Sequence, residues 1–306
     1  LTVLHQIDQN TVNEEINLFK PKTSYRTRGR GGKETLTEGT NLPNGVIVHF
    51  NVKNFSPDKD ELSIHFKEHD GTIIKTYKSN DEIDKLEIKS GGNTFVWNTL
   101  YEGAEILDSM IFWSASFSGA KAVPGKYKVV LEKNGESQEQ EFEILPDPRS
   151  EVSISQMRLQ FDFVNKVNAT VDKAHKAIKN IRQIRKKLEE FDSNFSENES
   201  VINLVEKAKQ LNSSLTEIEK ALYQTKNRSR QDPLNFPIKL TNKLGHLNSL
   251  VTSNDFPPTN QDELVRKELT AEVENHILKY QKLVSKDLKY FNEEFASLNL
   301  DYLTVK

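Results

Sequence analysis

The chain has 306 residues, of which 42 are Lys or Arg and 45 are Asp or Glu, so its formal net charge at pH 7 is -3. A general nucleic-acid-binding protein is expected to carry an excess of positive charge, so this balance argues against nucleic acid as a partner. No apolar run approaches the roughly 20 residues that a membrane-spanning helix needs, and the absence of cysteine excludes disulfide bonds, thiolate nucleophiles and cysteine-based metal centres.

Residues 1–24 follow neither a clear strand pattern nor a long helical one, and we expect them to be a connector that arrives from an upstream domain. The chain starts at Leu1, with neither an initiator Met nor the basic and then apolar pattern of a signal peptide. We therefore expect the chain to be a piece of a longer protein.

The stretch SYRTRGRGG, residues 24–32, is similar to the arginine–glycine segments that bind RNA. It occurs once, in a chain without excess positive charge, and a strand pattern begins directly after it. Alternation along a strand places Arg26, Arg28 and Arg30 on one face. We expect these three arginines to serve docking between domains, by pairing with acidic residues of an upstream domain or of the helical region.

Between residues 25 and 148 the apolar residues recur with a period of two. Val46, Val48 and Phe50 share one face of a predicted strand, and similar short strands follow, separated by Gly, Asn and Asp. The clearest hairpin spans residues 124–145 and turns at Asn134 and Gly135, a favoured turn dipeptide. Several short alternating strands predict a β-sandwich of immunoglobulin or fibronectin type III character.

From residue 149 to residue 306 the period becomes helical, because Pro146 and Pro148 end the last strand. Four apolar stripes follow at steps of three and four, and four amphipathic helices bury such stripes most simply against each other. The last stripe consists of Leu269, Val273, Ile277, Tyr280, Val284, Leu288, Phe291 and Phe295. The sequence thus predicts an α+β multidomain chain in which an antiparallel four-helix bundle follows the sandwich. The second stripe is regular enough for pairing between chains, although burial within its own bundle is the simpler alternative.

Signatures of catalysis are absent from the sequence. There is no G-x-S-x-G, no H-E-x-x-H and no phosphate loop. Carboxylates are so abundant that no particular pair stands out as the two acids of a glycoside hydrolase. His65 and His69 lie on one side of a predicted strand, but four steps along a strand separate them by about 13 Å, too far to share one metal ion. We predict no catalytic residue, no metal site and no cofactor.

Aromatic residues cluster between Trp97 and Phe117, and two interpretations remain open. Exposed aromatic side chains on a β-sandwich can stack on sugars, and the candidates for such a site are Trp113, Phe112 and Tyr101. The alternative is packing in a core or a domain interface. Trp97 alternates with Phe95, which favours the core, whereas Phe112 and Trp113 point in opposite directions along a strand.

Several longer segments together resemble one bacterial family. They are residues 18–50, GGNTFVWNTLYEGAE, VPGKYKVVL, FEILPDPRS and FPIKLTNKLGHLNSLV, in this order. They are similar to the C-terminal region of large secreted proteins, chiefly from Bacteroidetes-type organisms, classed as BNR-repeat or sortilin-like glycosyl hydrolases. The resemblance covers residues 18–295, and its motifs are specific in combination and weak singly.

The resemblance implies a signal peptide and a sortilin-type β-propeller upstream, and a parent that is secreted, periplasmic or at the cell surface. Any glycosidase activity would then belong to the propeller. The expected function of this chain is that of a non-catalytic accessory region that packs on or presents the propeller. The alternative is a carbohydrate-binding module that uses the aromatic residues of the sandwich.

Overall fold

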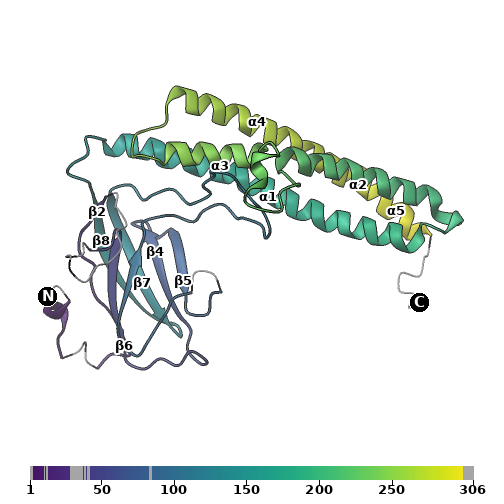
Figure 1. Ribbon diagram of the computed structural model, residues 1–306. Helices are drawn as coiled ribbons and strands as arrows, with labels where there is room; N and C mark the ends of the chain where they lie inside the picture. Colours follow the sequence, from purple (N-terminus) through teal and green to yellow (C-terminus); the bar gives the residue numbers. More distant parts are fainter. Residues whose placement is uncertain are drawn as a thin grey trace. The chain divides into compact units, whose positions relative to one another are not determined.

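The computed structural model describes residues 3–9, 11, 13–27, 37, 39, 42–82 and 85–298. Within these residues the fold is α+β, with two sheets followed by helices (Figure 1). The chain divides into two compact units. We call Leu1–Gly103 with Ser118–Phe161 the sheet unit, and Ala104–Phe117 with Asp162–Lys306 the helical unit.

The described residues of the sheet unit form one sheet with strand order β1-β3-β6 and a second with order β2-β8-β7-β4-β5. The strands are β1 (Ile16–Leu18), β2 (Ser24–Arg26), β3 (Val46–Val52), β4 (Leu62–Glu68), β5 (Ile73–Lys78), β6 (Gly91–Trp97), β7 (Gly125–Lys133) and β8 (Glu136–Pro146). Strands β2 and β8 pair in parallel, and the other paired strands are antiparallel. The predicted hairpin at Asn134 and Gly135 is confirmed, because both residues have the positive φ that a tight turn between β7 and β8 requires.

Side chains from both sheets form one hydrophobic core. Val46, Val48 and Phe50 of β3 are buried as the alternation predicts. The ring of Phe66 on β4 stacks on the fully buried ring of Trp97 on β6, with the ring centroids 4.5 Å apart. Burial of side chains of this size contributes about 1.5–3 kcal/mol each, so the alternating strands account for the packing of this unit.

Two short segments depart from the predicted boundaries. Residues 16–18, predicted as part of a connector, form strand β1, whose Ile16 and Leu18 are buried and which pairs with β3. Three residues are too few to show a period in the sequence. Residues 104–117, predicted within the sandwich, contain no strand and belong to the helical unit. We call Ala104–Phe117 the strap.

The helices are α1 (Ile154–Phe195), α2 (Ile202–Leu222), α3 (Leu240–Val251), α4 (Asn260–Lys282) and α5 (Lys289–Ser297). A π-helical segment, Leu283–Leu288, joins α4 to α5, and short 3-10 turns lie at Leu4–Gln6, Glu199–Val201 and Asp232–Leu234. Of the helices in the described part of the chain, none is both long and apolar enough to cross a membrane.

The directions of the helices differ from the predicted antiparallel four-helix arrangement. Helices α2 and α3 follow one another along α1 (Figure 1), and both run against it, since Arg182 pairs with Glu219 and Asn168 with Asn248. Helices α4 and α5 run parallel to α1, because α1 residues pair with partners about 100 positions later, as in the contact of Phe191 with Phe291. The reason is the link of residues 223–239, which carries the chain onward instead of reversing it.

Candidate functional site

The strap is an irregular segment of the helical unit whose backbone is bound by side chains from several other elements. It forms no strand ladder, and polar side chains from α1, from α3 and from the segment after α2 bind most of its hydrogen-bonded backbone groups. Unpaired backbone groups are costly when they are buried, so these side chains define where the strap lies. We treat the strap and its partners as the candidate functional site.

The middle of the strap is bound by three side chains that lie far away in the sequence. The amide of Asn242 on α3 accepts a hydrogen bond from Trp113 N and donates one to Trp113 O, both at 2.8 Å. The hydroxyl of Tyr223 accepts from Ile111 N at 2.8 Å, and the Asn227 side chain donates to Ile111 O at 3.2 Å. This part of the strap therefore has its backbone satisfied on both sides.

The beginning of the strap is bound by α1. Glu105 N donates to Asp172 Oδ1 at 2.8 Å, Glu105 O contacts His175 Nδ1, and the Glu105 carboxylate pairs with Lys179 Nζ at 3.0 Å. His175 is 0% exposed. Burial lowers the pKa of His175 below its usual value, because a charged ring loses its hydration there.

The end of the strap is bound by α3. Ser116 N donates to Gly245 O at 2.9 Å, and His246 Nδ1 lies 3.0 Å from Ser114 O. A Cβ atom on Gly245 would lie 2.6 Å from Phe117 Cζ and 2.8 Å from Ala115 Cβ. Glycine is therefore required at this position for the strap to approach the helix.

Apolar contacts complete the site. Phe112 and Phe117 of the strap pack against each other with ring centroids 4.5 Å apart, and each lies 5.8 Å from the ring of His175. Tyr223 lies edge-on to Phe112 at 5.6 Å. The strap thus covers His175 with two aromatic rings.

The three residues predicted to stack on sugars are placed differently from one another. Phe112 faces inward, as just described, whereas Trp113 is 41% exposed, so these neighbours offer no shared exposed surface. Tyr101 belongs to the sheet unit, where its hydroxyl donates to Glu68 and its ring lies edge-on to Phe161, with centroids 4.7 Å apart. Burial and the neighbouring Glu68 raise the pKa of Tyr101.

Of the three arginines predicted for docking, Arg26 is described, while Arg28 and Arg30 lie outside the described residues. Arg26 is 2% exposed. Its guanidinium donates to Lys121 O at 2.8 Å, to Ala122 O at 2.7 Å and to Gln160 Oε1 at 3.1 Å. Arg26 therefore contacts the start of α1, and these three partners all lie in the sheet unit.

The two histidines considered for a metal site have separate partners. His65 Nδ1 lies 2.9 Å from Thr76 Oγ1 and its Nε2 lies 2.9 Å from Ser63 Oγ, whereas His69 lies 3.8 Å from Glu141. Over the residues that the structure describes, no group of three His, Asp or Glu side chains is arranged to hold a metal ion.

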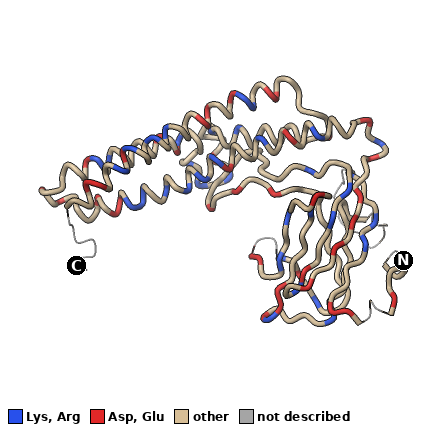
Figure 2. Tube along the Cα trace, turned by 180° about the vertical axis from the view of Figure 1, so that it is seen from behind, with Lys and Arg blue, Asp and Glu red and all other residues tan. Residues whose placement is uncertain are grey.

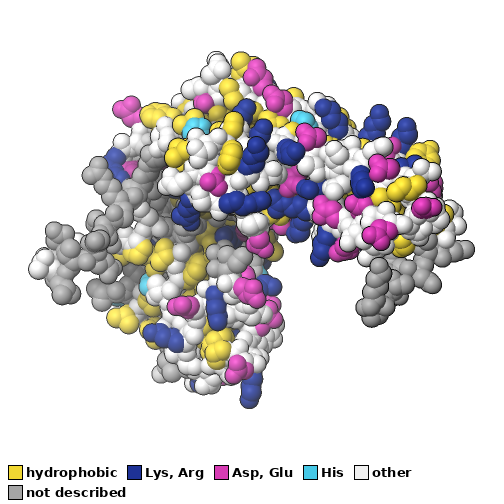
Figure 3. Space-filling model, turned by 45° about the vertical axis from the view of Figure 1, so that its right-hand side comes forward, with side chains coloured by type: hydrophobic (Ala, Val, Ile, Leu, Met, Phe, Trp, Pro, Cys, Tyr) yellow, Lys and Arg dark blue, Asp and Glu magenta, His cyan; other side chains and the backbone are white. Residues whose placement is uncertain are grey.

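Charged residues are spread over the molecule. Both acidic and basic residues lie along the helices (Figure 2), and pairs such as Lys186 with Glu190 and Lys289 with Glu293 follow the helical spacing. On the face shown in Figure 3 the cationic, anionic and apolar side chains are interspersed.

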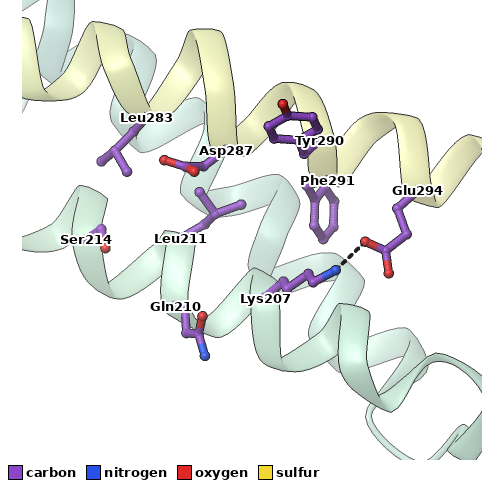
Figure 4. Close-up of a pocket in the computed structure, with 9 residues that line it drawn as sticks. All are labelled: Lys207, Gln210, Leu211, Ser214, Leu283, Asp287, Tyr290, Phe291 and Glu294. Atoms are coloured by element: carbon purple, nitrogen blue, oxygen red, sulfur yellow. Dashed lines mark hydrogen bonds and ion pairs between the residues drawn. The ribbon is translucent and has the colours of Figure 1, made fainter.

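A groove of about 420 Å³ lies between α2 and the π-helical segment with α5 (Figure 4). Leu211, Leu283 and Phe291 contribute apolar side chains to it, and Lys207 pairs with Glu294 at one end. A second groove, of about 470 Å³, lies between α1 and α5 and is lined mainly by apolar residues.

Comparisons with known proteins add little to this description. No family model and no curated protein matches the chain. A solved structure titled pT26-6p is 12% identical, with a TM-score of 0.13, over 78% of this chain and 46% of that one. The chain thus spans less than half the length of that structure, and no property is carried over from so low a similarity.

The partners of the strap are residues that the sequence pattern did not single out. Asn242, Tyr223 and Asn227 lie more than 100 positions after the strap. Two signals could have indicated them. The buried face of α3 carries Asn242 and Asn248 among its leucines, and Gly245 stands in the middle of a helix, where glycine is unfavourable without a packing reason.

Proposed function

We propose that this chain is a non-catalytic accessory region of a larger secreted or cell-surface protein, and that it acts by binding and spacing a neighbouring domain. Its finer architecture would be an immunoglobulin- or fibronectin-type sandwich followed by a helical bundle. The observation that supports this function is the strap. Because the strap belongs to the helical unit, the chain passes between the two units three times, at residues 103–104, 117–118 and 161–162, where a simple two-domain chain has one linker.

The partner we propose is an upstream β-propeller of the same parent, as the resemblance to BNR-repeat and sortilin-like proteins implies. Any glycosyl hydrolase activity would belong to that propeller.

The test is to produce the upstream part of the parent separately and to measure its binding to this chain by calorimetry, together with glycan hydrolysis by each piece and by the whole parent. We expect binding, and hydrolysis only where the upstream part is present. Turnover of a glycan by this chain alone, or the absence of any binding between the pieces, would overturn the proposal.

A second candidate is carbohydrate binding, favoured by the exposed ring of Trp113. The two hydrogen bonds with Asn242 hold the backbone of Trp113, so the backbone that carries the exposed indole is ordered before any ligand binds, which favours binding. Affinity electrophoresis in polysaccharide gels would test this. If this chain binds carbohydrate through Trp113, Trp113→Ala should abolish the retardation of the protein in the gel. Tyr290 is an exposed aromatic residue on α5, and Tyr290→Ala should leave the retardation unchanged. Equal migration of all three proteins in every gel would contradict it.

A further inference from the structure

His175 has an arrangement that suits a proton-operated device. It lies on α1 with its ring fully buried, and the rings of Phe112 and Phe117 of the strap lie beside it. Its Nδ1 contacts Glu105 O, which is consistent with a neutral ring protonated at Nδ1. Its Nε2 is buried and has no hydrogen-bond partner.

A second proton on this ring would bind at Nε2, where no acceptor is available. It would turn Nε2 into a buried donor without an acceptor, and it would place a positive charge between apolar rings, both of which are costly. Since the two rings that cover His175 belong to the strap, lifting the strap hydrates the charged ring. Unfolding α1 would achieve the same result at the loss of a complete helix.

Charged neighbours of His175 come from two elements. Asp172 and Arg182 lie on α1, and Glu105 lies on the strap, where its carboxylate also pairs with Lys179. The two acids favour protonation and Arg182 opposes it, but burial acts more strongly than any of them. On α3, His246 Nδ1 lies 3.0 Å from Ser114 O of the strap.

We propose that the strap is an acid-released latch, in which protonation of His175 lifts residues 104–117 from the helices while the helices stay folded. The strap suits this role because side chains hold most of its bonded backbone groups and no strand ladder does. Ser109 and Ser114 also have positive φ, a conformation that non-glycine residues adopt only under constraint. When the strap opens, both residues can return to negative φ, and this favours the open state once the contacts of the strap weaken.

The pH window follows from the direction of the shift. The pKa of His175 in the folded protein lies below the value of 6.5 for an unperturbed ring. The open strap therefore binds more protons than the closed strap as the pH falls below about 6.5. The equilibrium constant for strap closure is at its full value above this pH. It falls by about tenfold for each pH unit between 6.5 and the pKa of His175 in the closed protein.

The experiment is hydrogen exchange of the whole chain, followed by mass spectrometry from pH 7.5 to pH 5 and corrected for intrinsic exchange. We expect amides 105–117 to lose protection by about tenfold or more, while amides of α1 and α2 keep theirs. His175→Asn keeps a donor near Glu105 O and removes the titration, so its strap protection should not change with pH. His69→Asn, at an exposed histidine of the sheet unit, is the matched control and should respond to pH as the original chain does.

Two results would overturn the latch. One is strap protection that stays constant over this range in the original chain, and the other is simultaneous loss of protection in α1. If His175→Asn does not fold, NMR titration of the His175 Cε1 proton in the original chain replaces it. The latch requires His175 to titrate with the same midpoint as strap opening, and a ring that titrates under a closed strap refutes it.

Discussion

Replacing Gly245 by alanine tests whether the strap is seated directly on α3. The added Cβ would lie 2.6 Å from Phe117 Cζ, 2.7 Å from Phe117 Cε1 and 2.8 Å from Ala115 Cβ. Contacts this short cannot be kept, and the Cβ of Ala115 has no rotamer through which to move away. The strap or the helix must therefore shift, which also strains the hydrogen bond from Ser116 N to Gly245 O.

Two opposing effects set the size of the result. Overpacking a core costs about 1–3 kcal/mol, and the fixed position of Ala115 places this case in the upper half of that range. Alanine in a helix interior is more favourable than glycine by about 1 kcal/mol. We therefore expect Gly245→Ala to lower the free energy of unfolding of the helical unit by about 1–2 kcal/mol.

Urea denaturation followed by circular dichroism at 222 nm measures this change. Leu250→Ala is the control, because Leu250 is an exposed residue of the same helix and its replacement should cost less than about 0.5 kcal/mol. In a Phe117→Leu background the cost of Gly245→Ala should fall, since the clashing ring atoms are gone. A stabilised Gly245→Ala protein would show that only helix propensity acts, and the seating of the strap described above would then be wrong.

Three further substitutions should have measurable effects. Arg26→Met removes three donated hydrogen bonds inside the sheet unit and should cost about 2–3 kcal/mol in thermal or urea unfolding monitored by Trp97 fluorescence in a Trp113→Phe background. Glu219→Gln weakens a buried carboxylate that accepts from two α1 arginines and should cost about 1–3 kcal/mol, whereas exposed Glu217→Gln should be neutral. Asn242→Leu leaves both backbone groups of Trp113 without their partner and should raise hydrogen exchange of the strap about tenfold or more.

Much of the sheet unit could be predicted from the sequence because each strand carries its own signal. Alternating residues such as Val46, Val48 and Phe50 need only a buried face on one side, and the turn at Asn134 and Gly135 needs only its local backbone. Strand β1 was missed because three residues show too little of the period. The packing of Trp97 in the core also followed from local alternation.

The strap could not be predicted in this way, because its conformation depends on residues far away in the chain. Its sequence contains Ile111, Phe112 and Trp113 in a row, which indicates a buried strand as readily as an irregular segment. The decisive partners are Asn242 and Tyr223, whose side chains replace the hydrogen bonds of a neighbouring strand. Side-chain recognition of backbone has no period, so no pattern in residues 104–117 reveals it.

The π-helical segment, by contrast, follows from arithmetic on the last apolar stripe. Phe295 lies 295 − 269 = 26 positions after Leu269, and the stripe makes seven turns over this distance, whereas seven turns of α-helix take only about 25 residues. One extra residue must be absorbed, or the end of the stripe rotates away from the core. The structure absorbs it between Leu283 and Leu288, so Leu283 packs on the core where steps of four predict Val284. The groove in Figure 4 lies beside this turn, and its position along the helix is therefore set by the spacing of the stripe.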